Sequence, residues 1–268
     1  MFTLPLYDDN PVGDRPVITW LLIALCVAVF LWQQTLPPRL QEASVYGLGV
    51  VPAVLFGYDT LPLGFRMVPG WASIFTSMFM HGSWMHLIGN TWFLWIFGHG
   101  VEGAMGPVRY LAFYLLSGIA AALAQSFADP TSTLPMIGAS GAIAGVLGAY
   151  FVLYPYANVR VLFFFFLFIR VVNVPALIVL GLWFVGQVLS GAAVPMDQGG
   201  VAFWAHIGGF LAGVALVPLF RHSHRTLWGD ARSRSFAIMP AQAIRRGSVP
   251  ETPYRPSGRS PWGGFGRG

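Results

Sequence analysis

Five polar residues stand near the starts of three apolar segments, where few polar side chains are expected. His81, His86 and Asn90 lie close to the start of one segment. Ser140 lies near the start of a second segment, and His206 near the start of a third. A serine hydroxyl becomes a nucleophile when a base takes its proton and nearby donors stabilise the oxyanion. These residue types therefore indicate hydrolytic chemistry, provided that the three segments meet.

The spacing of the five residues predicts a role for each. His206 is the candidate base for Ser140, and no Asp or Glu at these segment starts could complete a triad, so we expect a catalytic dyad. The backbone N–H of Ser140, the Asn90 amide and the His86 imidazole are the candidate oxyanion donors. His86 and Asn90 are four residues apart and share a helix face. His81 is about 140° away from His86 around a helix, which predicts that it braces the adjoining loop.

Glycines surround the serine and recur near the third histidine. Gly138 and Gly141 flank Ser140 and are expected to support it. The glycines of the two segments stand at positions 138, 141, 145, 148, 208, 209 and 213. Because small residues let helices approach closely in lipid, we expect these two segments to pack against each other.

A zinc site is the competing chemistry for His81, His86 and His206. The chain has no H-E-x-x-H motif, and no carboxylate ligand stands near these histidines. A metal would also leave Ser140 without a role. We therefore expect neither a metal nor any other cofactor.

The composition is typical of a membrane protein. Hydrophobic residues make up 56% of the 268-residue chain and charged residues only 9%, whereas soluble domains carry about a quarter charged residues. A membrane crossing takes about 20 apolar helical residues. Six apolar runs suit this role, at approximately 17–36, 83–100, 107–127, 136–155, 174–191 and 201–221. The sequence thus predicts an all-α polytopic membrane protein with six transmembrane helices.

The arginines predict the orientation of these helices. The chain has no lysine, and nine of its fifteen basic residues fall between Arg221 and Arg267. With both termini in the cytoplasm, only Arg39 and Arg66 lie outside, which satisfies the positive-inside rule. The second, fourth and sixth helices then all run inward, so their first turns meet at one depth. A bacterial inner membrane is the expected location.

The chain is expected to have three parts. Residues 1–16 form a cytoplasmic N-terminal segment, residues 17–221 the membrane domain, and residues 222–268 a disordered basic cytoplasmic tail. The tail is rich in arginine and can attract anionic membrane lipids. Nucleic acid is not an expected partner, since no folded binding module accompanies the charge.

Two other stretches are apolar without being expected crossings. The connection at 37–82 is long and aromatic, which indicates partly buried structure at the outer leaflet, with a short interfacial helix over 71–80. Residues 161–172 are expected to run along the membrane surface, because polar residues and a proline interrupt the apolar run. Asn173 is the expected N-cap of the helix that follows.

The three motifs resemble those of a known family. Segments 81–90 (HGSWMHLIGN), 138–141 (GASG) and 205–209 (AHIGG) are similar, in order and spacing, to those of the rhomboid intramembrane serine proteases. The resemblance covers about residues 17–221. It implies a six-helix bundle whose serine is the nucleophile and whose third-motif histidine is the base. It also implies single-pass transmembrane proteins as substrates, cut near the outer membrane face.

Further residues match features of this family. The resemblance implies a lateral gate formed by the fifth helix and the outer loop, for which Trp183 and Phe184 are bulky enough. It implies a structural hydrogen-bonding role for Glu102, which is followed by Gly106. Some rhomboids carry a tyrosine one turn after the nucleophile, stacked on the catalytic histidine, whereas this chain has Ala144. Another group must then hold the base.

Two alternative functions remain open on the sequence alone. A non-catalytic rhomboid-like protein would bind membrane helices, but such relatives are expected to have lost the nucleophile or the base, and this chain has both. A channel or transporter could use the histidines for ion or proton transfer. Inverted repeats would favour that reading, and none is visible. An intramembrane serine endopeptidase is therefore the principal hypothesis.

Overall fold

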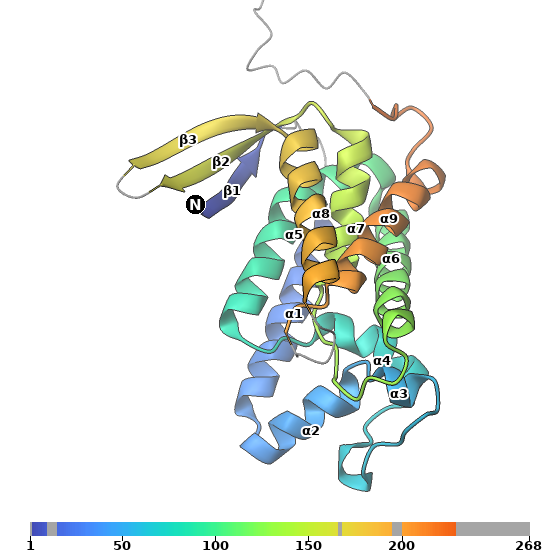
Figure 1. Cartoon of the computed structure of the whole chain (residues 1–268). Helices are drawn as coiled ribbons and strands as arrows, with labels where there is room; N and C mark the ends of the chain where they lie inside the picture. Colours follow the sequence, from blue (N-terminus) through green and yellow to red (C-terminus); the bar gives the residue numbers. More distant parts are fainter. Residues whose placement is uncertain (1, 10–14, 166–167, 195–199, 229–268) are drawn as a thin grey trace, which may run out of the picture. The chain divides into compact units, whose positions relative to one another are not determined.

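Long helices occupy the six apolar runs of the chain. The computed structural model describes residues 2–9, 15–165, 168–194 and 200–228. Its long helices are α1 (Val17–Thr35), α5 (Trp84–Met105), α6 (Pro107–Ala128), α7 (Ser140–Leu153), α8 (Ala176–Ala193) and α9 (Phe203–Phe220) (Figure 1). The helical bundle is thus confirmed. Within the described residues, four of these helices (α1, α6, α8 and α9) are long and apolar enough to cross a membrane. Six crossings remain a prediction.

Helix α7 is the central element of the bundle. It contacts α5, α6, α8 and α9, and nearly all of its residues are buried. A Cβ atom on Gly209 would overlap the carbonyl oxygen of Gly141, and one on Gly213 would overlap that of Gly145. This close approach of α7 and α9 confirms the packing predicted from the glycines. Because the paired numbers rise together, the two helices run parallel and start at the same end of the bundle.

Short helical elements fill the connection between α1 and α5. They are α2 (Pro38–Leu48), α3 (Pro52–Leu55), η1 (Leu63–Phe65), α4 (Gly70–Thr76) and η2 (Ser77–Phe79). The short helix predicted over 71–80 is therefore present as α4 and η2. Trp71 is 67% exposed, whereas Ile74 and Met78 are buried. This connection lies at the end of the bundle from which α5, α7 and α9 start (Figure 1).

A three-stranded antiparallel sheet lies at the other end of the bundle (Figure 1). Its strands are β1 (Phe2–Asp8), β2 (Asn158–Phe165) and β3 (Phe168–Pro175), in that order. The all-α prediction did not include this sheet, although runs of Val and Phe favour strands. The prediction of Asn173 as a helix N-cap is wrong, because Asn173 pairs with Arg160 inside the sheet. Helix α8 starts at Ala176, and Pro175 precedes it.

Glu102 fixes the start of α1 against the end of α5. Its carboxylate accepts hydrogen bonds from the backbone N–H of Ile18 at 2.9 Å and of Thr19 at 2.8 Å. The Thr19 hydroxyl donates a third bond at 2.8 Å. These first-turn N–H groups have no partner within their own helix, so the carboxylate satisfies them. The structural role implied by the family resemblance agrees with these contacts.

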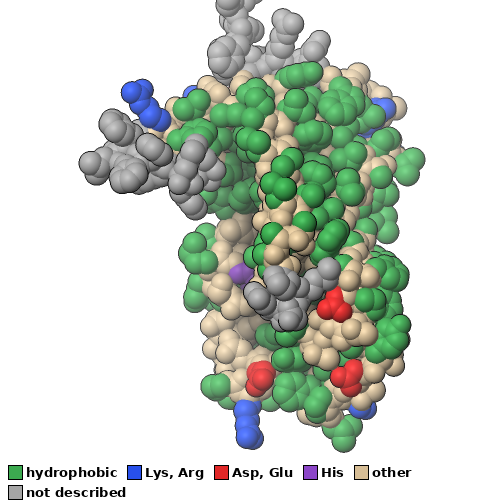
Figure 2. All heavy atoms as spheres, in the orientation of Figure 1, with side chains coloured by type: hydrophobic (Ala, Val, Ile, Leu, Met, Phe, Trp, Pro, Cys, Tyr) green, Lys and Arg blue, Asp and Glu red, His purple; other side chains and the backbone are tan. Residues whose placement is uncertain are grey.

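The surface of the bundle suits a lipid environment. Figure 2 shows a face covered mostly by hydrophobic side chains, with the visible arginines near the two ends. The tail predicted at 222–268 is described only as far as residue 228, so its predicted disorder lies outside the described residues. The three predicted parts of the chain likewise remain predictions.

Candidate active site

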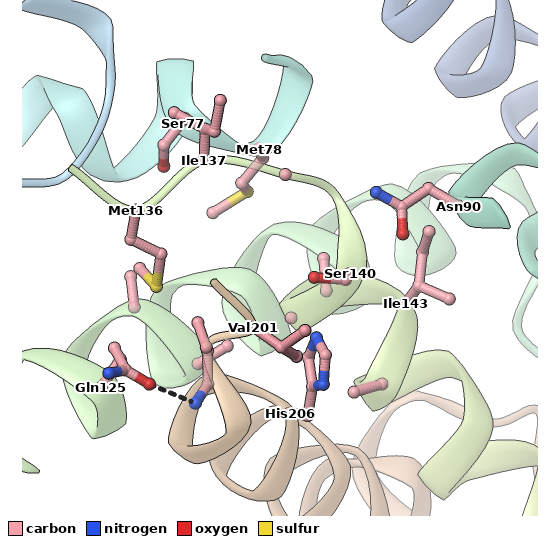
Figure 3. A pocket seen from close by; sticks show the side chains of 18 of the residues that line it. Ser77, Met78, Asn90, Gln125, Met136, Ile137, Ser140, Ile143, Val201 and His206 are labelled. Atoms are coloured by element: carbon pink, nitrogen blue, oxygen red, sulfur yellow. Dashed lines mark hydrogen bonds between the residues drawn. The ribbon is translucent and has the colours of Figure 1, made fainter. Parts of the chain in front are cut away.

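One cavity lies where α5, α7 and α9 start. Its volume is about 680 Å³. The predicted site residues that line it are His86, Asn90, Gly138, Ser140, Gly141 and His206. Figure 3 shows the Ser140 hydroxyl between the Asn90 amide and the His206 imidazole, each from a different helix. The structure therefore brings together the three apolar segments, as their shared depth predicted.

The backbone around Ser140 aims donors at the cavity. Ser140 is the first residue of α7, and no side chain caps this helix start. Its N–H and that of Gly141 have no partner within the helix and are available to an anion. Gly138 has a φ of 128°, and a Cβ atom there would lie 2.7 Å from His86 Nε2. A glycine is thus required for the turn to pass against His86.

Asn90 presents an unused donor. The residue is 8% exposed, and its Nδ2 atom has no hydrogen-bond partner among the described residues. A buried amide without a partner costs free energy, about 1–3 kcal/mol in proteins. Asn90 lines the cavity, so this unpartnered donor lies close to the place where a ligand oxygen would bind.

His86 lies beside Asn90 with one ring nitrogen already engaged. The backbone N–H of Gly82 donates a long hydrogen bond of 3.5 Å to His86 Nδ1. An accepting Nδ1 leaves the proton of the neutral ring on Nε2. A Cβ on Gly138 would meet both Cε1 and Nε2 of this ring at 2.7 Å, so this edge of the imidazole lies against the turn before Ser140. His86 can therefore donate to an oxyanion at this place.

His81 does not line the cavity and packs against His86, which does. Its backbone N–H donates to Gln33 Oε1 at 3.1 Å, and its Nδ1 contacts the Phe79 carbonyl oxygen at 3.2 Å. Its ring lies 5.1 Å from that of His86, edge to face. Burial, and then the neighbouring His86, lower the pKa of His81 to about 4, so the ring is neutral at pH 7. These contacts support the predicted bracing role.

Helix α8 holds His206 through two residues. His206 Nδ1 lies 2.7 Å from Oε1 of Gln187. The Trp183 ring, one turn earlier on α8, lies 5.9 Å from the imidazole with a tilt of 35°. Sequence reasoning missed Gln187, although it is an amide in an otherwise apolar helix and one turn after Trp183. These two residues therefore contact the base in a chain that has Ala144 one turn after the serine.

Ser140 and His206 face each other without a hydrogen bond among the described residues. Catalytic hydrogen bonds are often long before substrate binds and shorten in the reacting complex.

The carboxylate of Asp129 also lines the cavity, where it accepts from the Thr131 hydroxyl at 3.2 Å. In the described part of the chain, no group of three or more His, Cys, Asp or Glu could hold a metal. The geometry therefore favours a two-residue serine site.

The fold and the site define an integral membrane protein of the rhomboid family. A family model described as Rhomboid domain matches residues 69–223, more than half of the chain. The chain belongs to this family. Rhomboid protein 1, mitochondrial, from Saccharomyces cerevisiae is 31% identical over 233 residues, which cover 76% of this chain.

Bacterial proteins are also similar to this chain. Rhomboid protease GluP from Bacillus subtilis is 32% identical over 207 residues, which cover 76% of this chain. Rhomboid protease AarA from Providencia stuartii is 30% identical over 147 residues, 49% of each chain. The match covers 63% of the yeast protein and 36% of GluP, less than two thirds of either. Since relatives also include mitochondrial and chloroplastic proteins, a bacterial inner membrane and cytoplasmic termini remain predictions.

Proposed function

We propose that this chain is an intramembrane serine endopeptidase that uses a Ser140–His206 dyad. The observation that carries this proposal is the single cavity lined by Ser140, His206 and Asn90, at the matching starts of three helices. Relatives named as rhomboid proteases support it. The substrates are single-pass transmembrane proteins, cut in or near their membrane segment.

The reaction has two steps. The Ser140 Oγ attacks the peptide carbonyl carbon while His206 Nε2 takes the hydroxyl proton and then gives it to the leaving amine. The Ser140 N–H, the Asn90 amide and His86 Nε2–H donate to the oxyanion. Water then attacks the acyl-enzyme, with His206 again as the base.

Cleavage of a reconstituted transmembrane substrate tests the dyad. Ser140→Ala and His206→Ala should each reduce kcat by at least about 10³-fold, and the double variant should lose little more, because the pair acts as a unit. Ser126→Ala is a matched control, since Ser126 is buried outside the cavity. His224→Ala, in the exposed segment after α9, is the second control.

The same assay separates a protease from a helix-binding protein. A serine-directed phosphonate should label the parent chain at Ser140 and leave Ser140→Ala unlabelled. If purified Ser140→Ala cleaves the substrate as fast as the parent, Ser140 is not the nucleophile. A parent chain that binds transmembrane peptides but neither cleaves them nor reacts with the phosphonate would instead be a non-catalytic rhomboid.

A further inference from the structure

Gln187 makes the one side-chain hydrogen bond that the described residues give to the His206 imidazole. The bond joins Gln187 Oε1 on α8 to His206 Nδ1 on α9 at 2.7 Å. An amide oxygen only accepts hydrogen bonds, so Nδ1 must carry the proton. A neutral imidazole with its proton on Nδ1 has its lone pair on Nε2. That nitrogen is the one left for Ser140.

The tautomer decides whether His206 can act as a base. A proton on Nε2 would leave no lone pair to accept the hydroxyl proton of Ser140. Without an acceptor at Nδ1, the neutral ring can hold its proton on either nitrogen and rotate about its side-chain bonds. An acceptor fixed at Nδ1 removes both freedoms. In a triad a carboxylate has this task, and here no carboxylate bonds to His206 in the described part of the chain.

We propose that Gln187 is a positioning residue that holds His206 in the base-competent tautomer and orientation. This inference rests on the proposed protease function and extends it to α8. A neutral amide suits the place because a buried carboxylate would need further donors in an apolar helix. The cost is that an amide stabilises the imidazolium less than a carboxylate would.

The same contact couples the base to α8. Only Ala176, Leu180 and Gly191 of this helix are buried, so α8 is held weakly compared with α7. Trp183 and Gln187 lie one turn apart on the face that meets His206. Displacement of α8 would break both contacts at once. The base is therefore oriented only while α8 is packed against α9.

Three substitutions of Gln187 test the proposal in the full-length chain, with a reconstituted transmembrane substrate. Gln187→Leu removes the acceptor, and Gln187→Asn keeps the amide but shortens it by one methylene. Gln187→Glu keeps an acceptor oxygen and adds charge. Val188→Leu is the control on the same helix, because Val188 is 41% exposed. His86 and Asp129, the titratable neighbours in the cavity, are unchanged in every variant.

The Leu and Asn variants should lose kcat by about 10–100-fold with KM within about twofold, since orientation of the base affects the chemical step. Gln187→Glu should recover most of kcat at alkaline pH. Its acidic limb of activity should move to higher pH, because a carboxylate stabilises the protonated ring. Val188→Leu should behave as the parent. A purely structural role for Gln187 would instead change KM together with kcat in the Leu and Asn variants.

Two results would overturn the proposal. The first is kcat within twofold of the parent in both the Leu and Asn variants, or in Asn alone if Leu does not fold. The second is an equal loss in Leu, Asn and Glu at every pH, which would show that an acceptor oxygen beside Nδ1 is not what His206 requires. Ser140→Ala in the same assay separates the two failures. If it still cleaves, the proposed Ser140–His206 dyad fails, whereas an inactive Ser140→Ala beside a fully active Gln187→Asn removes only the role of Gln187.

Discussion

Two buried polar side chains of α5, one toward each end of the helix, differ in their hydrogen bonding. At the end of α5, the Glu102 carboxylate receives three hydrogen bonds from Ile18 and Thr19. At the start of the same helix, Asn90 Nδ2 is buried and has no partner among the described residues. Both residues belong to one helix in one apolar environment, so burial alone does not distinguish them.

A second carboxylate at the Glu102 end is also paired. Asp8, whose side chain is 3% exposed, accepts from the Tyr150 hydroxyl and lies 3.2 Å from His99 Nε2. These contacts tie β1 to α5 and α7. A charge in an apolar bundle is stable only when donors surround it.

Glu102 and Asn90 therefore contribute differently to stability and to function. Side chains whose hydrogen-bonding capacity is used hold helices and strands together. Side chains whose capacity is unused at the cavity are available to a substrate, at some cost in stability. Substitutions at the two ends should therefore separate stability from activity.

The largest effect is expected at the paired end. Glu102→Ala leaves the N–H groups of Ile18 and Thr19 without an acceptor, and it should lower the free energy of unfolding by about 3 kcal/mol or more. Thermal unfolding in detergent measures the loss. Glu42→Ala is the matched control, because Glu42 is exposed on α2. An unchanged unfolding temperature for Glu102→Ala would refute the division between the two ends.

A smaller effect, a loss of activity without a loss of stability, is expected at the cavity. Asn90→Ala should reduce kcat/KM by about 10–100-fold, equivalent to about 1.4–2.7 kcal/mol, because one of several oxyanion donors is lost. Its unfolding temperature should stay the same or rise, since a buried unpaired amide is removed. Thr91→Val is the control, as Thr91 is next to Asn90 and outside the cavity. If Asn90→Ala is instead less stable and keeps full activity per folded molecule, Asn90 serves stability and not catalysis.

The sequence predicted the residues of the site better than the contacts that hold them in place. Ser140, Asn90 and His206 could be placed together because arginine positions predicted the topology and glycines predicted the contact of α7 with α9. These signals depend on period and composition along one helix at a time. Gln187 was missed because its importance depends on a partner 19 residues away on another helix, whose approach no local pattern encodes.

The sheet was not predicted from the sequence, for a related reason. Strand β1 pairs with β2 over about 155 residues of separation, so its partner is not visible in any local window. For residues 161–172 the sequence predicts a membrane-surface stretch, because Arg170, Asn173 and Pro175 interrupt the apolar run, and this prediction leaves out the strand preference of Val and Phe. The strand conformation of this region depends on tertiary pairing and on the Asp8 contacts to α5 and α7.

The smallest effect is expected where a hydrogen bond is lost without loss of packing. Tyr150→Phe removes the hydroxyl that donates to Asp8, but the ring can still pack at 5.0 Å from Phe97, and His99 remains beside the carboxylate. We expect a loss of about 1 kcal/mol in unfolding free energy and unchanged kcat. Tyr58→Phe is the control, because Tyr58 is 67% exposed. If Tyr150→Phe instead lowers kcat while stability is kept, the Asp8 cluster communicates with the dyad through α7, and the two ends are not separate.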